Sequence, residues 1–559
     1  MLLFYDCEVF RYNWLFVIIN SETHEKTIIF DDSDMIKEFY DKHKDHIWVG
    51  YNSRHYDQYI LKSIICGFNP YEVSRHIISG AQGWEYSNLF QKIQLYNFDI
   101  MTSMHGLKEL EGFMGNDIRE SSVSFDIDRA LTETELEDAI AYCTHDVEQT
   151  IEVFLQRREE FDSQIALLKA FDLPLKFISK TKAQLAAIIL KAHKQDRNDE
   201  FNIVLPNTLE ISQYRHIVDW YNENRDYEKY LEIVVSGIPH VFAWGGLHGA
   251  IDNYKGEGFF ISIDVSSYYP SLMIEYGFLS RNVEDPEVYK QIYYERLRLK
   301  SLKDPMQQPY KIVLNATYGA MKHKFNNLYD PLQANNVCVG GQLLLLDLIE
   351  KLEPYWKLIQ SNTDGLIGKV KHSSDFEKIE SVCLEWEQRT LMKLEFDTFK
   401  RIFQKDVNNY IIVHEDGSYK SKGAYVKKLN DIDNDLPIVN KALVEYFIKD
   451  IPVEDTINNC REIIMFQKVV KISSKYSHAL HGNKRLREKC LRVFASKDIQ
   501  DPSIYKVKES KGKAEKIANT PEHCFIFNDA VLGKRISRKL DREWYITLAL
   551  SRVEDFIGE

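Results

Sequence analysis

Short apolar runs separated by polar turns open the chain and predict a β-sheet. Each run is rich in aromatic and β-branched residues, which fit the pleated, buried surface of a sheet. The runs cover residues 2–9, 14–20, 26–30 and 47–51. Helical spacing follows over 133–157, where Thr132 is the expected N-cap and Glu135 its capping-box partner. Residues 1–160 are therefore predicted to form one domain that combines a sheet with helices.

Periodicity in the rest of the chain predicts further bodies of mixed structure. Residues 161–243 are mostly helical in pattern, with a packed helix over 178–193, and we interpret them as a connector. We expect strands at 259–263, 357–359 and 366–370 and helices at 285–303, 310–321 and 542–556. The predicted fold class is therefore α/β with several domains.

The composition is typical of a globular protein without a membrane anchor. Of the 559 residues, 44% are hydrophobic and 28% are charged, and this length suggests roughly three or four domains. The longest uninterrupted apolar runs, such as 343–346, are too short to cross a bilayer. Asp6 and Glu8 interrupt the apolar start, so we expect no secretory segment and a cytoplasmic location. Eight scattered cysteines without a CxxC pair favour neither a zinc site nor a disulfide framework.

Charge is distributed unevenly along the chain. The formal net charge of −13 argues against a protein that only coats nucleic acid. The region up to about residue 160 is acidic, whereas 468–539 is rich in lysine and arginine. Such a basic stretch is either an ordinary solvated surface or a surface that faces phosphates.

Acidic and aromatic residues in the first domain could form a metal site. Asp6 and Glu8 are two apart on a strand and project to the same face, where a divalent cation would neutralise them unless the edge is simply solvated. Tyr142 and Asp146 are four apart on a helix and share a face. A phenol beside a carboxylate can orient a water on a metal, although Tyr142 alone could be a core aromatic.

Asn52 and Asp57 flank the loop between a strand and a helix. Ligands collect at such loops in α/β sheets, but an asparagine turn followed by an N-cap aspartate explains the pair equally well.

A second set of candidates surrounds Asp264, which ends the apolar strand 259–263. The residue is either a turn aspartate or a metal ligand, and Asp364 at the tip of the predicted hairpin is its expected partner. The elbow 266–270 after Asp264 offers hydroxyls, backbone N–H groups and aromatic rings. On the helix that follows, one stripe carries a cation, an amide and a phenol, namely Lys311, Asn315 and Tyr318.

The motifs in the first domain resemble those of DEDD-type 3′→5′ proofreading exonucleases. They are Asp6-x-Glu8, Asn52-x-x-x-Tyr56-Asp57 and Tyr142-x-x-x-Asp146, and the tyrosine in the third places the chain with the tyrosine variant of that group. The resemblance implies an RNase H-like domain over 1–160. It also implies two Mg²⁺ ions, replaceable by Mn²⁺, whose ligands are the four acids Asp6, Glu8, Asp57 and Asp146. The same resemblance implies that Tyr142 is catalytic and that Asn52 contacts the substrate.

The motifs between residues 264 and 364 resemble those of family B DNA polymerases of the compact bacteriophage type. Motif A is Asp264-Val265-Ser266-Ser267-Tyr268-Tyr269-Pro270-Ser271, motif B is Lys311-x-x-x-Asn315-x-x-Tyr318-Gly319, and motif C is Thr363-Asp364. The resemblance implies that Asp264, Val265 and Asp364 hold two Mg²⁺ ions. It implies that Tyr269 excludes the ribose 2′-OH. The implied substrate-binding residues are Arg296, Lys300, Lys311, Asn315, Tyr318 and Tyr410.

The same resemblance implies a domain plan and partners. A palm with an antiparallel sheet would cover 244–285 and 323–428, helical fingers 286–322, and a thumb 429–559. Basic segments at 466–476, 484–492 and 534–539 would follow the backbone of the primer duplex. The expected partners are primer–template DNA and dNTPs, acting on a monomer that replicates a phage genome in the host cytoplasm. A clamp, a helicase or a single-strand binding protein is not identifiable from the residues.

Three departures from the family pattern leave alternatives open. Asn362 and Gln360 stand where motif C usually has an acid and an aromatic residue, and Asn408 replaces the lysine of the downstream lysine–tyrosine pair. Lys405, Lys420 or Lys422 could substitute for that lysine. The close spacing of the three motifs disfavours priming by a terminal protein. The alternatives are a 3′→5′ exonuclease with a degenerate polymerase half and a non-catalytic nucleic-acid-binding scaffold.

Overall fold

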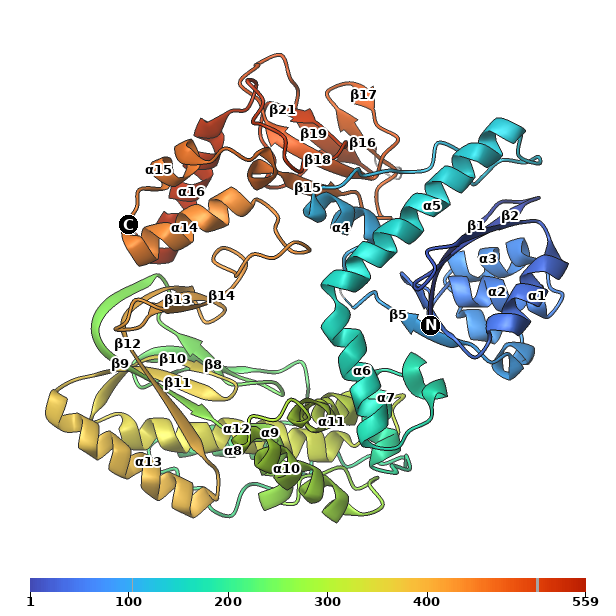
Figure 1. Cartoon of the computed structure of the whole chain (residues 1–559). Coiled ribbons are helices and arrows are strands. Elements are labelled where there is room, and N and C mark those ends of the chain that lie inside the picture. Colours follow the sequence, from blue (N-terminus) through green and yellow to red (C-terminus); the bar gives the residue numbers. More distant parts are fainter. Residues whose placement is uncertain (103, 509–511, 559) are drawn as a thin grey trace. The chain divides into compact units, whose positions relative to one another are not determined.

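The chain folds into two compact units, which we describe separately in a computed structural model (Figure 1). The structure describes residues 1–102, 104–508 and 512–558. The first unit comprises Met1–Ser179, Leu429–Val439 and Ile457–Ile546, and the second comprises Lys180–Lys428, Asn440–Thr456 and Thr547–Glu559. Each unit therefore combines segments that are far apart in the sequence.

A five-stranded sheet with helices on both faces forms the N-terminal part of the first unit. Its order is β3-β2-β1-β4-β5, with β1–β3 antiparallel and β4 and β5 parallel to β1. The strands are β1 (Leu2–Val9), β2 (Trp14–Asn20), β3 (Lys26–Phe30), β4 (Ile47–Gly50) and β5 (Tyr96–Asp99). The helices are α1 (Ser33–His43), α2 (Asp57–Ile65), α3 (Pro70–Ile78), α4 (Leu107–Met114), α5 (Glu133–Gln156) and α6 (Arg158–Ala170). This arrangement agrees with the predicted RNase H-like fold.

Alternation along β1 decides which residues face which helices. Leu3, Tyr5 and Cys7 belong to the core that packs with α1, α2 and α3. Phe4 points the other way and meets Phe154 of α5 at a centroid separation of 5.1 Å. Because side chains alternate on a strand, Asp6 and Glu8 lie on the Phe4 face, toward α5.

The start of α5 confirms the predicted capping box. The Thr132 hydroxyl accepts a hydrogen bond from the Glu135 backbone N–H at 3.3 Å, and the Glu135 carboxylate accepts from the Thr132 N–H at 2.9 Å. Two backbone donors that have no partner within the helix are thereby satisfied.

Two small sheets in the first unit come from the C-terminal part of the chain. One has the order β15-β18-β21 and the other β17-β16-β19-β20. The strands are β15 (Lys468–Lys471), β16 (His478–His481), β17 (Lys484–Arg485), β18 (Cys490–Ala495), β19 (Ile504–Val507), β20 (Ala514–Lys516) and β21 (Cys524–Ile526). We call residues 468–508 and 512–526 the C-terminal β lobe.

A nine-stranded antiparallel sheet organises the second unit (Figure 1). Its order is β14-β13-β12-β9-β11-β10-β8-β7-β6. The strands are β6 (Leu231–Val235), β7 (Ile238–Phe242), β8 (His248–Ala250), β9 (Tyr254–Val265), β10 (Trp356–Asn362), β11 (Gly365–Val370), β12 (Leu394–Asp406), β13 (Asn409–Val413) and β14 (Tyr419–Lys422). This sheet, together with the helices of the second unit, agrees with the predicted α/β class.

Helices of the second unit include a long buried one, α12. They are α7 (Lys182–Ile189), α8 (Arg215–Glu223), α9 (Tyr268–Glu275), α10 (Pro286–Ser301), α11 (Gln307–Lys322), α12 (Pro331–Leu352) and α13 (Phe376–Thr390). By length and apolar composition α12 could cross a membrane, but 94% of its most apolar window is buried inside the unit. It is therefore a core helix of this unit. Three more helices contain or adjoin a boundary between the units: α14 (Pro437–Lys449), α15 (Val453–Asn459) and α16 (Arg542–Ile557).

The middle of the chain differs from its prediction in two places. The predicted connector 161–243 ends in strands β6 and β7, which join the nine-stranded sheet through β8. A two-residue turn, Ser236-Gly237, with both residues at positive φ, allows this hairpin. The predicted helix 178–193 shortens to Lys182–Ile189, because Thr181 caps its first turn by accepting from the Gln184 N–H.

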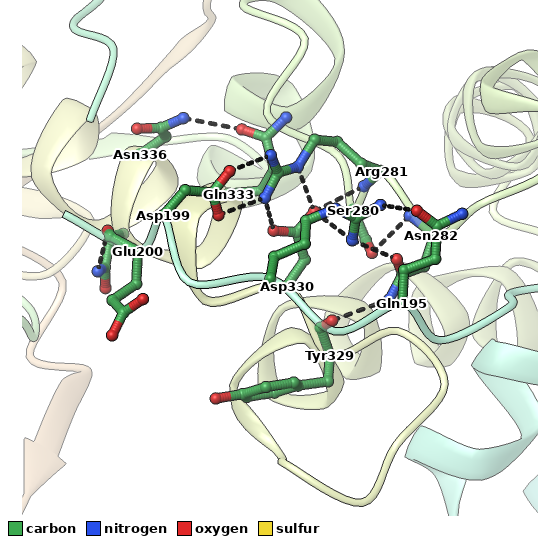
Figure 2. A network of polar contacts seen from close by, with 12 residues as sticks. Gln195, Asp199, Glu200, Ser280, Arg281, Asn282, Tyr329, Asp330, Gln333 and Asn336 are labelled. Carbon is green, nitrogen blue, oxygen red and sulfur yellow. Dashed lines mark hydrogen bonds and ion pairs between the residues drawn. The ribbon is translucent and has the colours of Figure 1, made fainter. Parts of the chain in front are cut away.

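A polar network closes the base of the helical hairpin formed by α10 and α11 (Figure 2). Asp330 follows α11 and is fully buried, and it accepts hydrogen bonds from the Nη2, Nε and backbone N–H of Arg281, which precedes α10. Asp199, in the loop between α7 and α8, accepts from Nη1 of the same guanidinium through its Oδ2 at 2.7 Å. Asn282 donates to the carbonyl of Tyr329 at 2.8 Å. The two ends of the hairpin are thus held together.

Asp347 on α12 is expected to be essential for the stability of the second unit. This fully buried carboxylate accepts from both terminal nitrogens of Arg389 at 3.0 Å and from the Glu210 N–H at 2.7 Å. Asp347→Ala would remove the buried partner of Arg389 and leave it only exposed carboxylates, so we expect the free energy of unfolding in urea to fall by about 3 kcal/mol. Glu385→Gln, which removes the exposed partner of the same arginine, should change it by less than about 1 kcal/mol. Equal losses in the two variants would contradict the role of Asp347.

Candidate active sites

Four carboxylates gather in the first unit, as the sequence pattern suggests. Asp6 and Glu8 come from β1, Asp57 from the first turn of α2 and Asp146 from the middle of α5. Burial and the surrounding carboxylates raise the pKa of both Asp6 and Glu8 well above ordinary values. Burial also raises the pKa of Asp57 to about 7 and that of Asp146 to about 6. Such crowding of like charges fits oxygen ligands for a divalent cation, which would relieve it.

A lysine that the sequence motifs do not include neutralises part of this cluster. Lys108, on α4, places its ammonium against the Asp146 carboxylate and 3.0 Å from Glu111 Oε1. The same ammonium lies 4.6 Å from the centre of the Tyr142 ring. Lys108 is 38 residues from Asp146 along the chain, so only the packing of α4 against α5 brings the two together.

Two buried thiols also contact the acids. Cys7 donates to Asp57 Oδ1 at 3.1 Å, and Cys143 donates to Asp6 Oδ2 at 3.6 Å. Ligand atoms of Asp6, Glu8 and Cys143 lie within 4.8 Å of one another. Burial raises the pKa of the Tyr142 phenol, and the nearby charges of Asp146, Glu8 and Asp6 raise it further. Tyr142 therefore faces the acids and is not only a core residue.

Asn52 occupies the loop before α2 but its side chain is exposed. Its φ of 58° is left-handed, and its N–H donates to Asp99 Oδ1 at 2.9 Å. Asp99 also accepts from the Arg54 N–H at 3.0 Å, so it shapes this loop. Asn52 lies at the predicted place without a described contact to the four acids.

In the second unit, strand register brings Asp264 and Asp364 together. Asp264 on β9 pairs with Gly365 on β11, and the next residue, Val265, donates its N–H to the Asp364 carbonyl at 2.7 Å. A Cβ on Gly365 would lie 2.1 Å from Asp264 Oδ1, so only glycine leaves room for this carboxylate. Burial and then the charge of Asp364 raise the pKa of Asp264. These adjacent acids fit a divalent cation.

The elbow after Asp264 forms one wall of a cavity of about 270 Å³. Ser267 begins α9 with a left-handed φ of 52°. Tyr268 turns into the core and donates to the Gly341 carbonyl at 2.6 Å, whereas the Tyr269 ring lies 4.4 Å from the Tyr318 ring. The cavity is lined by Val265, Ser267, Tyr268, Tyr269, Pro270, Arg296, Lys311, Asn315, Thr363 and Asp364. Most of the predicted residues of this site therefore meet around one space.

The two predicted phosphate ligands on α10 behave differently. Arg296 donates from Nη1 to Ser267 Oγ, and its buried Nε has no hydrogen-bond partner among the described residues. Lys300 pairs with Glu395 Oε1 at 3.0 Å. Glu395 also accepts from Ser266 Oγ at 2.9 Å, and these two contacts lower its pKa. Lys300 is thus paired with an acid, whereas Arg296, which lines the cavity, contacts the Ser267 hydroxyl.

Glu395 is a further acid at this site, and no sequence motif indicated it. It lies opposite Asp264 in the pairing of β9 with β12. Directly opposed residues project to the same face of a sheet, so Glu395 is a neighbour of Asp264. Its place depends on a strand register that the sequence pattern does not specify.

The remaining candidates near Asp264 and Asp364 lie in the β10–β11 hairpin and on the strands after it. Burial raises the pKa of the Tyr410 phenol, and the nearby charges of Asp264 and Asp364 raise it further. Asn362 Oδ1 accepts from the Thr363 N–H at 2.9 Å and shapes the turn that carries Asp364. Of the candidate substitutes for the missing lysine, Lys420 lowers the pKa of Asp264, whereas Lys405 pairs with Asp555 at 3.5 Å.

Comparison with known proteins identifies relatives for part of the chain. No family model matches. The chain is 27% identical over 230 residues to DNA polymerase 1 of Saccharolobus solfataricus, covering 40% of this chain and 23% of the relative. It is 26% identical over 203 residues to DNA polymerase 1 of Sulfolobus acidocaldarius, covering 36% of this chain and 22% of the relative. The matches thus span less than a quarter of these curated relatives.

A solved structure was also found. The family B DNA polymerase of Pyrobaculum calidifontis aligns with a TM-score of 0.42 and 16% identity, covering 99% of this chain and 77% of that chain.

The raised pKa values predict how pH affects the metal-free protein. Asp57 has a pKa of about 7 in the folded state, against an ordinary 3.8, so the unfolded chain loses this proton first as pH rises. Stability conferred by the protonated carboxyl is therefore present below about pH 4 and lost as pH rises toward 7. We expect the melting temperature of the first unit in chelator to fall between about pH 4 and pH 7. Asp57→Asn should flatten the decline, and added Mg²⁺ should oppose it. A melting temperature that rises over this interval in chelator would contradict the assignment.

Proposed function

We propose that this chain is a family B DNA polymerase that adds deoxynucleotides to a primer 3′-OH and carries a 3′→5′ exonuclease. The observation that carries the proposal is the adjacency of Asp264 and Asp364 beside a cavity lined by Lys311, Arg296 and Tyr269. The names of the archaeal relatives support it. The separate acid cluster of the first unit supports the exonuclease.

At the polymerase site the chain's residues bind and orient the nucleotide. Asp264, Asp364 and the Val265 carbonyl would hold two Mg²⁺ ions, which supply charge neutralisation for nucleotidyl transfer when bound. Lys311 and Arg296 line the cavity, and their cationic side chains are suited to triphosphate oxygens. Tyr269, packed on Tyr318, presents a fixed ring to the sugar.

Asn315 and Tyr410 are further candidates for substrate contacts. Asn315 lines the cavity one helical turn after Lys311, and Tyr410 is near enough to Asp264 and Asp364 for their charges to raise its pKa. Lys300 would reach a phosphate only after leaving Glu395. We infer that Glu395 and Lys300 form a pair whose exchange accompanies nucleotide binding.

At the exonuclease site, the acids would hold two further divalent ions, and Mn²⁺ could replace Mg²⁺ at both sites. Tyr142 lies close enough to Asp146, Glu8 and Asp6 for their charges to raise its pKa, and its phenol is suited to orient the attacking water. Lys108 holds Asp146 and offsets the negative charge of the cluster. Asn52, exposed at the neighbouring loop, is suited to contact the strand that is cut.

The wider assignments follow from this proposal. Residues 244–285 and 323–428 would be the palm, 286–322 the fingers and 429–559 the thumb, with 161–243 as connector. The substrates would be primer–template DNA and dNTPs, and the enzyme would act as a monomer in the cytoplasm. Replication of a phage genome remains a prediction from the motif pattern.

A nuclease with an inactive polymerase half is the second candidate function. The observation that favours it is the engagement of Lys300 by Glu395, together with asparagine at positions 362 and 408. Primer extension with four dNTPs separates the candidates, because degradation that does not depend on nucleotides would leave only the nuclease. A scaffold without chemistry would bind DNA in the presence of chelator and turn over no strand.

Substitution of one acid in each site should separate the two activities. We expect Asp264→Ala to lower primer extension by at least about 1,000-fold, because it removes a carboxylate that holds transition-state charge. Degradation of single-stranded DNA should persist. Asp6→Ala should do the reverse. Each variant's remaining activity reports that the protein is folded, and loss of both activities in either one would contradict the assignment of two sites.

Tyr269 should control the choice between deoxyribose and ribose. Tyr269→Ala opens the cavity next to the nucleotide sugar, so we expect discrimination against ribonucleotides to fall by at least about tenfold in single-nucleotide incorporation. Tyr268→Phe is the control, since Tyr268 points into the core and contacts Gly341. Unchanged discrimination in Tyr269→Ala would remove this role.

A further inference from the structure

A fully buried arginine of the C-terminal β lobe holds the end of helix α4. Arg492, on β18, lies in a stretch that the sequence pattern assigned to DNA contacts, but its exposed fraction is 0%. Its guanidinium donates to the carbonyls of Gly112 at 3.1 Å and Asn116 at 2.7 Å. It also donates to the Asp529 carbonyl at 2.7 Å and to Gln467 Oε1 at 2.9 Å. Arg492 is thus inaccessible to DNA and serves contacts within the first unit.

The charge of Arg492 suits this position. The last carbonyl groups of a helix have no partner within it and carry partial negative charge, which a cation stabilises. Burial lowers the pKa of Arg492 to about 10, so the guanidinium is still charged at neutral pH. Its donors point in several directions at once, a geometry that a lysine ammonium does not reproduce.

Other contacts fix the same end of α4. Asn434 and Gln467 both donate to the Phe113 carbonyl, at 2.9 and 3.2 Å. A Cβ on Gly112 would lie 2.9 Å from Val469 of β15, so the glycine lets the helix approach the lobe closely. Lys471 of the lobe pairs with Glu109 at 2.7 Å. The lobe therefore contacts α4 along most of its length.

The same helix also carries residues that meet the acid cluster. Lys108 and Glu111, three residues apart, meet there, and Lys108 reaches Asp146. Rotation of α4 about its axis would carry Lys108 away from Asp146 on α5 and would move the fully buried Glu111 out of its place. The position of the Lys108 ammonium is therefore tied to the position of the α4 backbone, which Arg492 holds.

We propose that Arg492 is a positioning residue of the exonuclease site, which fixes α4 so that Lys108 stays against Asp146. The proposal rests on the exonuclease activity proposed above. It gives the C-terminal β lobe, assigned to the thumb by its sequence, a role in hydrolysis by the first unit. Arg492 acts through Lys108 and does not touch the substrate.

The test compares nuclease kinetics of full-length Arg492→Lys, Lys108→Met and the double variant on single-stranded DNA. We expect Arg492→Lys to lower kcat by about 10- to 100-fold, the range for residues that orient a reacting group, with KM and primer extension unchanged. The double variant should be no slower than Lys108→Met, because both changes remove the same interaction. Arg75→Lys, the same change at an exposed position of the first unit, is the control.

Each other outcome counts against a specific statement. A normal kcat in Arg492→Lys, or a double variant whose loss is the product of the single losses, overturns the positioning role. Equal decreases in nuclease and extension activity also overturn it, since they indicate general destabilisation. If the unsubstituted protein degrades no DNA while extending primers, the proposed exonuclease itself fails, which is distinct from failure of the role of Arg492.

Discussion

The repulsion between buried carboxylates is the constraint on which both sites depend. Asp6, Glu8 and Asp57 are gathered where burial disfavours their charge, and Asp264 is placed beside Asp364 in the same way. The free energy that it takes to bury these like charges together is offset when cations neutralise them. In the first unit the protein supplies one cation itself, Lys108, and the remaining acids are the candidate metal ligands.

Strand geometry determines how each pair of acids comes together. On β1 the two-residue repeat places Asp6 and Glu8 on one face of a single strand. In the second unit the acids come from different strands, and the register of β9 with β11 aligns them. That register requires glycine at 365, so a residue without a side chain decides where a carboxylate lies. A shift by one residue would turn Asp264 to the opposite face of the sheet.

Local features of the sequence predicted much of this structure. The strands of the first sheet, the capping box at Thr132 and the motif acids all follow from spacing within short segments. Lys108 and Glu395 did not, because each reaches its site through packing or pairing with a distant segment. The surroundings of Arg492 were also beyond prediction. The composition of a basic stretch does not indicate whether its side chains contact phosphates or buried carbonyl groups. Only the tertiary contacts distinguish these two roles.

The division of the chain has a consequence for its synthesis. The first unit needs residues 457–546, yet the whole of 180–428 is made in between. At ordinary rates of translation this delay is on the order of tens of seconds. During that time the end of α4, with Phe113 and its free carbonyl groups, has emerged from the ribosome without the segment that covers it. Throughout that interval, this surface is open to premature contacts with other parts of the growing chain.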